Sequence, residues 1–112
     1  MFELRFVEKP WGREEIWAHT EAYVGKVLTI YNGHRLSKQY HEHKVETIRV
    51  IQGRLTLLLG DDTLLLYGGQ SAHIPAGTVH RMEARDGDVV LVEVSTPQLD
   101  DVVRIEDDYA RA

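Results

Sequence analysis

Hydrophobic and polar residues alternate in short stretches along this chain, and turn-forming residues separate the stretches. An alternation of period two places successive side chains on opposite faces, which is the pattern of a half-buried β-strand. No segment of 11 or more residues has the apolar spacing of an amphipathic helix. The pattern predicts strands over residues 25–31, 46–52, 54–59, 63–67, 80–84 and 88–94.

Turn signals organise the predicted strands. Gly60-Asp61-Asp62 predicts a hairpin between the strands on either side of it, and Asp86-Gly87 predicts a second hairpin. The segment at residues 9–12, Lys-Pro-Trp-Gly, is expected to form a turn before the body of the sheet. Many short strands with regular turn signals are typical of an antiparallel sandwich or barrel, so the predicted fold class is all-β.

The length of 112 residues suits one domain, which we expect to span residues 1–112. Hydrophobic residues make up 43% of the chain, but no apolar run is long enough to cross a bilayer. The first residues lack the features of a signal peptide, so we expect a cytoplasmic protein with no membrane partner. The absence of cysteine excludes disulfides, thiolate metal ligands and a cysteine nucleophile.

The formal net charge is -5, from 13 basic and 18 acidic residues. An acidic balance without a basic stripe argues against a nucleic-acid partner. Much of the acid excess lies near the end of the chain, in Asp100-Asp101 and at residues 106–108. We interpret this end, about residues 106–112, as a solvated acidic tail.

Candidate metal ligands first appear just before the strand predicted at residues 46–52. Gln39, His41 and His43 would share one face of an extended segment, because residues two apart in a strand point the same way. Glu46 follows after a short bend and begins the next strand. Imidazoles and a carboxylate are the usual ligands of zinc, iron, manganese and nickel, so this group predicts a metal site.

A further histidine follows a second ordered spacing. Gly69 is followed by Pro75, Gly77 and His80, and Pro75-Ala76-Gly77 is expected to form a tight turn. This turn would deliver His80 onto a returning strand. A third imidazole would then reach the same barrel interior.

These two segments, within residues 33–53 and 69–84, resemble the two motifs of the cupin superfamily. The second segment matches the superfamily spacing through His80, and Ala84 stands where an Asn is usual. The resemblance implies a double-stranded β-helix, a jelly-roll-like β-barrel, that holds one divalent metal ion. The ligands that it implies are His41, His43, Glu46 and His80, with Gln39 as the alternative to Glu46.

A narrower resemblance covers about residues 8–111, nearly the whole chain. It is to the cupin domain of type II mannose-6-phosphate isomerases, which is often fused behind a mannose-1-phosphate guanylyltransferase. Residues 9–12 resemble that family's basic-Pro-Trp-Gly opening. Residues 33–43 resemble its Gly-x-Arg-Leu-Ser-x-Gln-x-His-x-His, and residues 74–81 its Ile-Pro-Ala-Gly-Thr-x-His-Arg. Thr47-Ile48 stands where the family usually has His-Trp.

The resemblance implies aldose–ketose isomerisation of a sugar phosphate, in which a base moves a proton between neighbouring carbons. Glu93, on a late strand, and a metal-bound hydroxide are the candidate bases. Arg35, then Arg81, then Lys9 are the candidate cationic anchors for the substrate, and Ser37 lies in the same row as the metal ligands. Alternation places Arg35 on the ligand side and Arg81 on the opposite side.

Other functions share these ligands. The alternatives are a metal-dependent dioxygenase that uses Fe(II) and a non-catalytic module that binds a sugar or another small molecule. A metal-free sugar epimerase is a further alternative, against which the complete ligand set argues. The metal stays open among zinc, manganese, nickel and iron. The resemblance also implies a homodimer, for which unpaired sheet edges give a physical motive.

Overall fold

The computed structural model describes residues 4–111, and this part of the chain consists of strands, turns and loops without a helix. The described residues accordingly contain no helix long and apolar enough to cross a membrane. The strands of the described chain are β1 (Arg5–Lys9), β2 (Gly12–His19), β3 (Val24–Ile30), β4 (Lys38–Tyr40), β5 (Glu46–Gln52), β6 (Arg54–Leu59), β7 (Asp62–Tyr67), β8 (Ser71–Ile74), β9 (His80–Glu83), β10 (Val89–Ser95) and β11 (Val103–Glu106).

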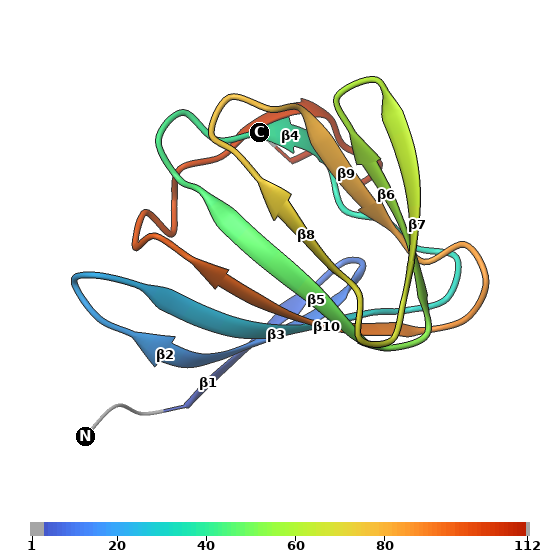
Figure 1. Ribbon diagram of the computed structural model, residues 1–112, viewed down its shortest axis with the longest axis horizontal. Coiled ribbons are helices and arrows are strands. Elements are labelled where there is room, and N and C mark those ends of the chain that lie inside the picture. Colours follow the sequence, from blue (N-terminus) through green and yellow to red (C-terminus); the bar gives the residue numbers. More distant parts are fainter. Residues whose placement is uncertain (1–3, 112) are drawn as a thin grey trace.

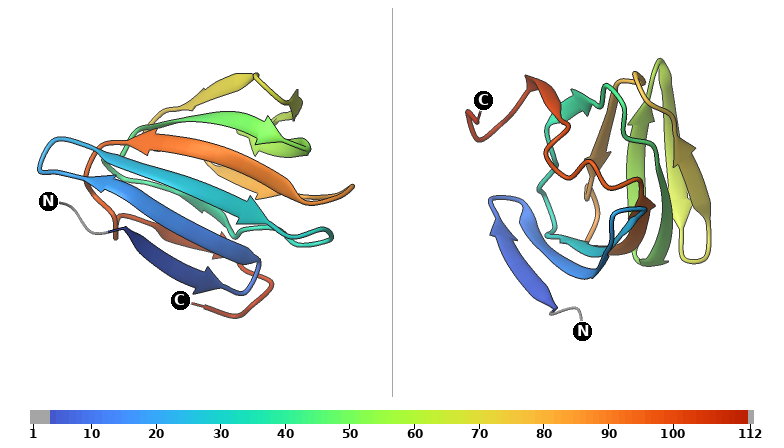
Figure 2. Two further views of the ribbon diagram at one scale, coloured as in Figure 1. Left: turned by 90° about the horizontal axis from the view of Figure 1, so that it is seen from below. Right: turned by 90° about the vertical axis from the view of Figure 1, so that its left-hand side faces the viewer.

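The strands form two antiparallel sheets that face one another (Figure 1). The larger sheet has the order β1-β2-β3-β10-β5-β8, and the smaller has the order β11-β4-β9-β6-β7. The predicted all-β class is therefore confirmed. Figure 2 shows both sheets from two further sides, with the interior between them.

Each of the six predicted strands is present. The hairpin predicted at residues 60–62 is also confirmed, because β6 and β7 pair directly across it. The hairpin predicted at Asp86-Gly87 is wrong, because β9 lies in the smaller sheet and β10 in the larger. Both edges of β9 are already paired, with β4 and with β6, so the chain has to cross to the other sheet. Turn residues at 86–87 could not show that β4 and β6 already occupy both edges of β9.

The N-terminal segment adds two strands that the sequence analysis did not predict. β1 and β2 pair through a turn in which Lys9 faces Gly12, so the turn expected at residues 9–12 is confirmed. Trp11, within this turn, is 3% exposed and packs into the core. The turn therefore anchors the edge of the larger sheet.

Residues 106–111 of the expected acidic tail are held against the smaller sheet and do not form a free tail, although Glu106 and Asp108 are exposed; residue 112 lies outside the described residues. β11 pairs with β4, where Glu106 faces Lys38. The carboxylate of Asp107 accepts hydrogen bonds from Arg111, and that of Asp108 accepts them from both Arg35 and Arg81. Charge density alone suggested solvation, whereas Glu106 and Asp108 pair with cations far away in the sequence and Asp107 pairs with the nearby Arg111.

Apolar side chains from the inner faces of both sheets form one core. Alternation supplies these side chains: in β10, and in β3 from Lys26 onward, every second residue is buried and the intervening ones are more exposed. The core residues are Trp11, Leu28, Ile30, Leu36, Ile48, Val50, Leu55, Leu57, Ile74, Met82, Ala84, Val89 and Leu91. Polar side chains occupy the remainder of the interior, toward the ends of β5, β9 and β10.

Candidate metal centre and its pocket

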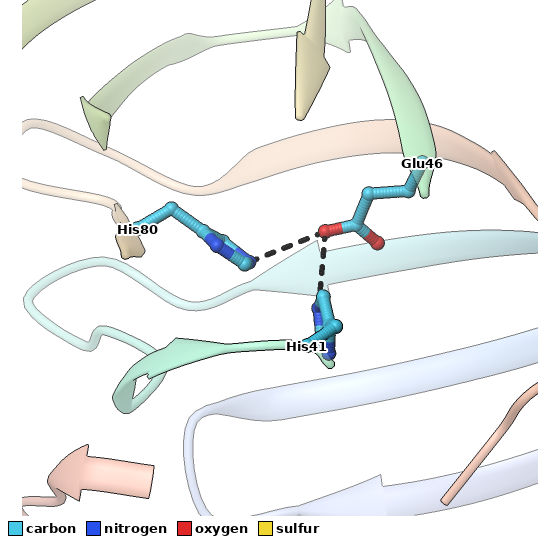
Figure 3. A group of neighbouring side chains, drawn as sticks. All are labelled: His41, Glu46 and His80. Carbon is cyan, nitrogen blue, oxygen red and sulfur yellow. Dashed lines mark ion pairs between the residues drawn. The ribbon is translucent and has the colours of Figure 1, made fainter. Parts of the chain in front are cut away.

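Three buried side chains meet in the interior between the sheets (Figure 3). His41 follows β4, Glu46 begins β5 and His80 begins β9. Nε2 of His41 lies 3.5 Å from Oε1 of Glu46, and Nε2 of His80 lies 3.3 Å from the same oxygen. Two imidazoles and a carboxylate, each offering one atom to a common point, form a donor set suited to a divalent metal ion.

Hydrogen bonds to backbone carbonyls fix both imidazoles. Nδ1 of His41 donates to the carbonyl of Asp101 at 2.5 Å, and Nδ1 of His80 donates to the carbonyl of Thr78 at 2.9 Å. A carbonyl only accepts, so each Nδ1 carries a hydrogen, and each Nε2 is the ring atom turned toward Glu46. Neither Nε2 has a hydrogen-bond partner among the described residues, although both are buried. This arrangement fits a metal ion, because metal-binding histidines usually donate their other ring nitrogen to such an acceptor.

Glu46 completes the triad as an anion. Burial alone would raise the pKa of its carboxyl group, but His41, His80 and the ammonium of Lys44 beside it hold that pKa well below its usual range. Nζ of Lys44 lies 3.4 Å from Oε2 of Glu46. One carboxylate oxygen thus faces the two imidazoles and the other faces a cation.

The structure does not bring His43 to this group. β4 ends at Tyr40, and the next residues bend around the carboxylate of Asp101. That carboxylate accepts backbone hydrogen bonds from residues 42, 43 and 44, at 2.9, 2.7 and 2.9 Å. The period-two argument assumed an extended chain through residue 43, and the bend leaves His43 exposed and directs Lys44 inward.

Gln39 does lie on the interior side. It is half-buried, it faces His80 in the register between β4 and β9, and it lines the same pocket as His41 and Glu46. An amide oxygen is a ligand type that several first-row ions accept. Gln39 is therefore better placed than His43 to add a ligand to the triad.

Glu93, the candidate base, also lies in this interior. It comes from β10, is 4% exposed, and places Oε2 3.2 Å from Nζ of Lys44. Burial raises the pKa of Glu93 to about 7, and the neighbouring carboxylate of Glu46 adds to that rise. Lys44 and Lys26 oppose the rise. Two nearby carboxylates with pKa values pushed apart are typical of acid–base sites.

A cavity of about 370 Å³ leads from this group toward β1 and β2. Its volume falls within the usual range of small-molecule sites, about 300–1,000 Å³. Six basic and four acidic side chains line it, although acidic residues outnumber basic ones in the whole chain. The basic side chains are Arg5, Lys9, Lys26, Lys44, Arg104 and Arg111, and the acidic ones are Glu14, Glu46, Glu93 and Asp100.

The predicted substrate anchors divide into two groups. Lys9 and Ser37 line the cavity, and Nζ of Lys9 lies 3.3 Å from a carboxylate oxygen of Glu14. Arg35 and Arg81 are instead bound to Asp108, away from the cavity lining. Arg35 was expected on the ligand side because of alternation. Alternation does not continue there, because the two residues between Arg35 and β4 lie outside any strand and are both buried.

Four functional candidates were missed in the sequence. Lys44 lies inside the first motif, but its position was assigned only to a bend. Asp101 was counted with an acidic excess, and its three backbone contacts depend on a loop 57 to 59 residues distant. Lys26 and Glu14 form a buried pair at 2.7 Å in the cavity wall. Inward parity was available as a signal only for Lys26 on β3, because the sequence analysis did not predict β2.

Comparison with solved structures agrees with the architecture. KdgF from Halomonas sp. superposes with a TM-score of 0.77 at 22% identity, covering 88% of this chain and 89% of that one. An RmlC-like cupin from Shewanella frigidimarina superposes with a TM-score of 0.79 at 13% identity, covering 88% and 87%. Two facing antiparallel sheets with a buried His-Glu-His group between them give this chain the double-stranded β-helix fold of the cupins.

The family follows from the sequence comparisons. The family described as "Mannose-6-phosphate isomerase C-terminal" matches residues 3–107, and this chain belongs to it. Xanthan biosynthesis protein XanB from Xanthomonas campestris is 35% identical over 111 residues, which are 96% of this chain and 24% of that protein. Mannose-1-phosphate guanylyltransferase ManC from Salmonella typhimurium is 36% identical over 112 residues, 96% and 23% of the two chains. The chain thus spans about a quarter of the length of these relatives.

Proposed function

We propose that this protein is a metal-dependent isomerase that interconverts an aldose phosphate and a ketose phosphate, with mannose 6-phosphate and fructose 6-phosphate as the substrate pair. The observation that carries the proposal is that Glu93 lines the same cavity as His41 and Glu46, and that His80 lies against this Glu46 from the other side of the triad. The membership of the chain in a mannose-6-phosphate isomerase family supports the choice of sugar.

The residues around the cavity suit the binding of such a substrate. His41, Glu46 and His80 would hold the metal ion, with Gln39 as an additional ligand. When bound, the ion supplies Lewis-acid stabilisation of negative charge on the substrate oxygens. The lining carries more basic than acidic side chains, which favours a substrate that carries a phosphate, because a positive balance of charge in a cleft attracts anionic ligands.

The acid–base chemistry belongs to Glu93. As the carboxylate it removes the proton from the carbon beside the substrate carbonyl, and as the carboxylic acid it returns that proton to the neighbouring carbon. A second proton moves between the two substrate oxygens, so the overall reaction is an isomerisation without a redox partner. A pKa of about 7 suits both roles near neutral pH. Lys44 holds the carboxylate in place through its ion pair.

The proposal is tested by reconstituting the purified protein separately with zinc, manganese, nickel and iron and measuring hexose phosphate interconversion. We expect metal-dependent turnover that falls by about 10²–10⁴-fold in Glu93→Gln, because general acid–base catalysis contributes that much. Metal binding in this variant should persist. Glu83→Gln is the matched control: Glu83 is equally buried at 4% exposed, but it pairs with Arg35 and Arg85 outside the cavity.

Two results would contradict the proposal. Turnover that Glu93→Gln leaves unchanged would remove Glu93 from the reaction. Bound metal without turnover on any hexose phosphate would refute the isomerase assignment; oxygen uptake by the iron-loaded protein would then indicate a dioxygenase, and sugar binding without product a binding module.

A further inference from the structure

The positive charges of the cavity are not spread evenly over its lining. The wall formed by β1, β2 and β3 carries three bases, Arg5, Lys9 and Lys26, against the single acid Glu14. Nζ of Lys26 lies 2.7 Å from one carboxylate oxygen of Glu14, and Nζ of Lys9 lies 3.3 Å from the other. Burial raises the pKa of Glu14, but the two ammonium groups outweigh burial and hold it below its usual value. Glu14 is therefore an anion, and this wall keeps two positive charges in excess.

The rest of the lining has no such excess. At the metal end, the ammonium of Lys44 lies between the carboxylates of Glu46 and Glu93. On the C-terminal segment, the carboxylate of Asp107 accepts side-chain hydrogen bonds of 2.8 and 3.2 Å from Arg111. The two other charged residues of the lining, at positions 100 and 104, are one acid and one base. The wall of β1, β2 and β3 is thus the part of the cavity that attracts an anionic group.

Arg5 is placed to meet an anion that enters the cavity. It lines the cavity and is also exposed, so the cavity reaches the surface beside it. Within residues 4–111 no carboxylate forms an ion pair with Arg5. Figure 2 (right) shows β1, in blue, and the C-terminal segment, in red, on the same side of the molecule. A guanidinium in this position can bind a phosphate through two parallel hydrogen bonds.

Strand register fixes how far Arg5 lies from the reacting end. Arg5 pairs with Ile16, Ile16 with Lys26, and Lys26 with Glu93, so one row of residues crosses β1, β2, β3 and β10. Strand spacings of about 4.8 Å separate the two ends of this row by about 14 Å along the sheet. An open-chain hexose 6-phosphate measures about 8 Å from C1 to phosphorus when extended, at about 3.5 Å for every three bonds. The side chains of Arg5 and Glu93 bridge the difference.

We propose that Arg5 and Lys9 bind the phosphate group of the substrate, while Glu93 and the metal centre act at the other end of the sugar. This assignment rests on the proposed isomerase function and extends it, because it fixes the orientation of the substrate in the cavity. Glu14 holds the ammonium of Lys9 in the wall, and the buried Lys26 holds Glu14. A phosphate dianion matches the two excess positive charges. The substrate class is therefore a sugar whose phosphate lies at the end of the chain away from the carbonyl.

Binding is measured by titration calorimetry in the zinc-loaded Glu93→Gln variant, so that turnover does not disturb the titration. The probes are fructose 6-phosphate and unphosphorylated fructose. Addition of Arg5→Gln or Lys9→Gln should weaken the binding of fructose 6-phosphate about 10–100-fold, the usual contribution of a hydrogen bond between charged groups, and leave the binding of fructose unchanged. Arg13→Gln is the matched control. Arg13 is an exposed base on the neighbouring strand β2 but does not line the cavity, so this variant should bind fructose 6-phosphate as its parent does.

Kinetics separate this assignment from the isomerase proposal. With Glu93 intact and metal bound, Arg5→Gln should raise KM for the hexose phosphate about 10-fold or more and leave kcat within about threefold, because Arg5 does not contact the reacting carbons. Metal-dependent turnover with an unchanged KM in both Arg5→Gln and Lys9→Gln would overturn the phosphate assignment while the isomerase proposal stands. Binding that Arg13→Gln weakens as much as Arg5→Gln does would also overturn it. Selective loss of fructose 6-phosphate binding, in a protein that turns over no hexose phosphate, would support the phosphate subsite and refute the isomerase.

Discussion

Replacement of Asp101 by alanine should weaken metal binding without abolishing it. The Asp101 carboxylate accepts the backbone hydrogen bonds of residues 42–44, and its backbone carbonyl accepts the hydrogen of His41 Nδ1. Asp101→Ala loses the three hydrogen bonds to the side-chain carboxylate and keeps the hydrogen bond from His41 to the backbone carbonyl. His41 can still donate to residue 101, but the bend that follows it loses the acceptor that holds it in place.

The expected magnitude follows from this division. Loss of groups that orient metal ligands typically costs about 10–100-fold in metal affinity, and we expect a loss in this range for Asp101→Ala. Competition titration with a chromophoric chelator measures it. Asp101→Asn keeps one side-chain oxygen acceptor and should fall between the wild type and Asp101→Ala. Asp100→Ala is the control, because the exposed neighbouring carboxylate makes none of these bonds, and its affinity should stay within about twofold of the wild type.

Two results would refute this reasoning. If Asp101→Ala binds metal as tightly as the wild type, the bend around the carboxylate does not position His41. If its affinity falls as far as that of His41→Ala, the carbonyl contact contributes nothing on its own and the division between side chain and backbone is wrong.

Three further predictions concern stability. Leu57→Ala, at a fully buried core position, should lower the free energy of unfolding by about 2–5 kcal/mol in urea titrations, whereas Leu65→Ala on the surface should have little effect. The hydrogen bonds from Arg111 hold the pKa of Asp107 at about 2, below about 3.9 in the unfolded chain, so their contribution is complete above pH 4 and is lost as the pH falls toward 2. Asp107→Asn should therefore lower the melting temperature at pH 7, and the gap to the wild type should close between about pH 4 and pH 2; a gap independent of pH would contradict this. Gly53→Ala should destabilise the protein by more than about 1–3 kcal/mol, because its φ of 87° is already unfavourable for alanine and its Cβ would lie 2.3 Å from a backbone oxygen; unchanged unfolding would show that the β5–β6 turn relaxes freely.

Much of the fold could be predicted from alternation and turn residues. Strands β3, β5 and β10 carry clear period-two patterns, and β6 and β7 are apolar runs on either side of a turn signal, so all five could be predicted from local sequence. The crossing after β9 could not be predicted in this way. It depends on which strands already occupy the two edges of β9, and that is a property of the assembled sheet.

The metal triad could also be predicted, and the limits of that prediction have a local cause. His41, Glu46 and His80 lie in two spaced motifs, each next to a strand that fixes its direction. His43 was included because a strand was assumed to continue through it, and a carboxylate from a distant loop ends that strand. Arg35 was assigned to the interior for the same reason. A period-two argument fails where the backbone bonds to a distant side chain and no longer to a neighbouring strand.

The central claim is that His41, Glu46 and His80, and not His43, form the metal centre. The most direct test is the metal content per chain of the wild type and of three matched variants, His41→Ala, His80→Ala and His43→Ala, after reconstitution and dialysis. The structure predicts one ion per chain in the wild type and in His43→Ala, and little or none in the other two. Loss of the ion in His43→Ala, with retention in His80→Ala, would contradict the account.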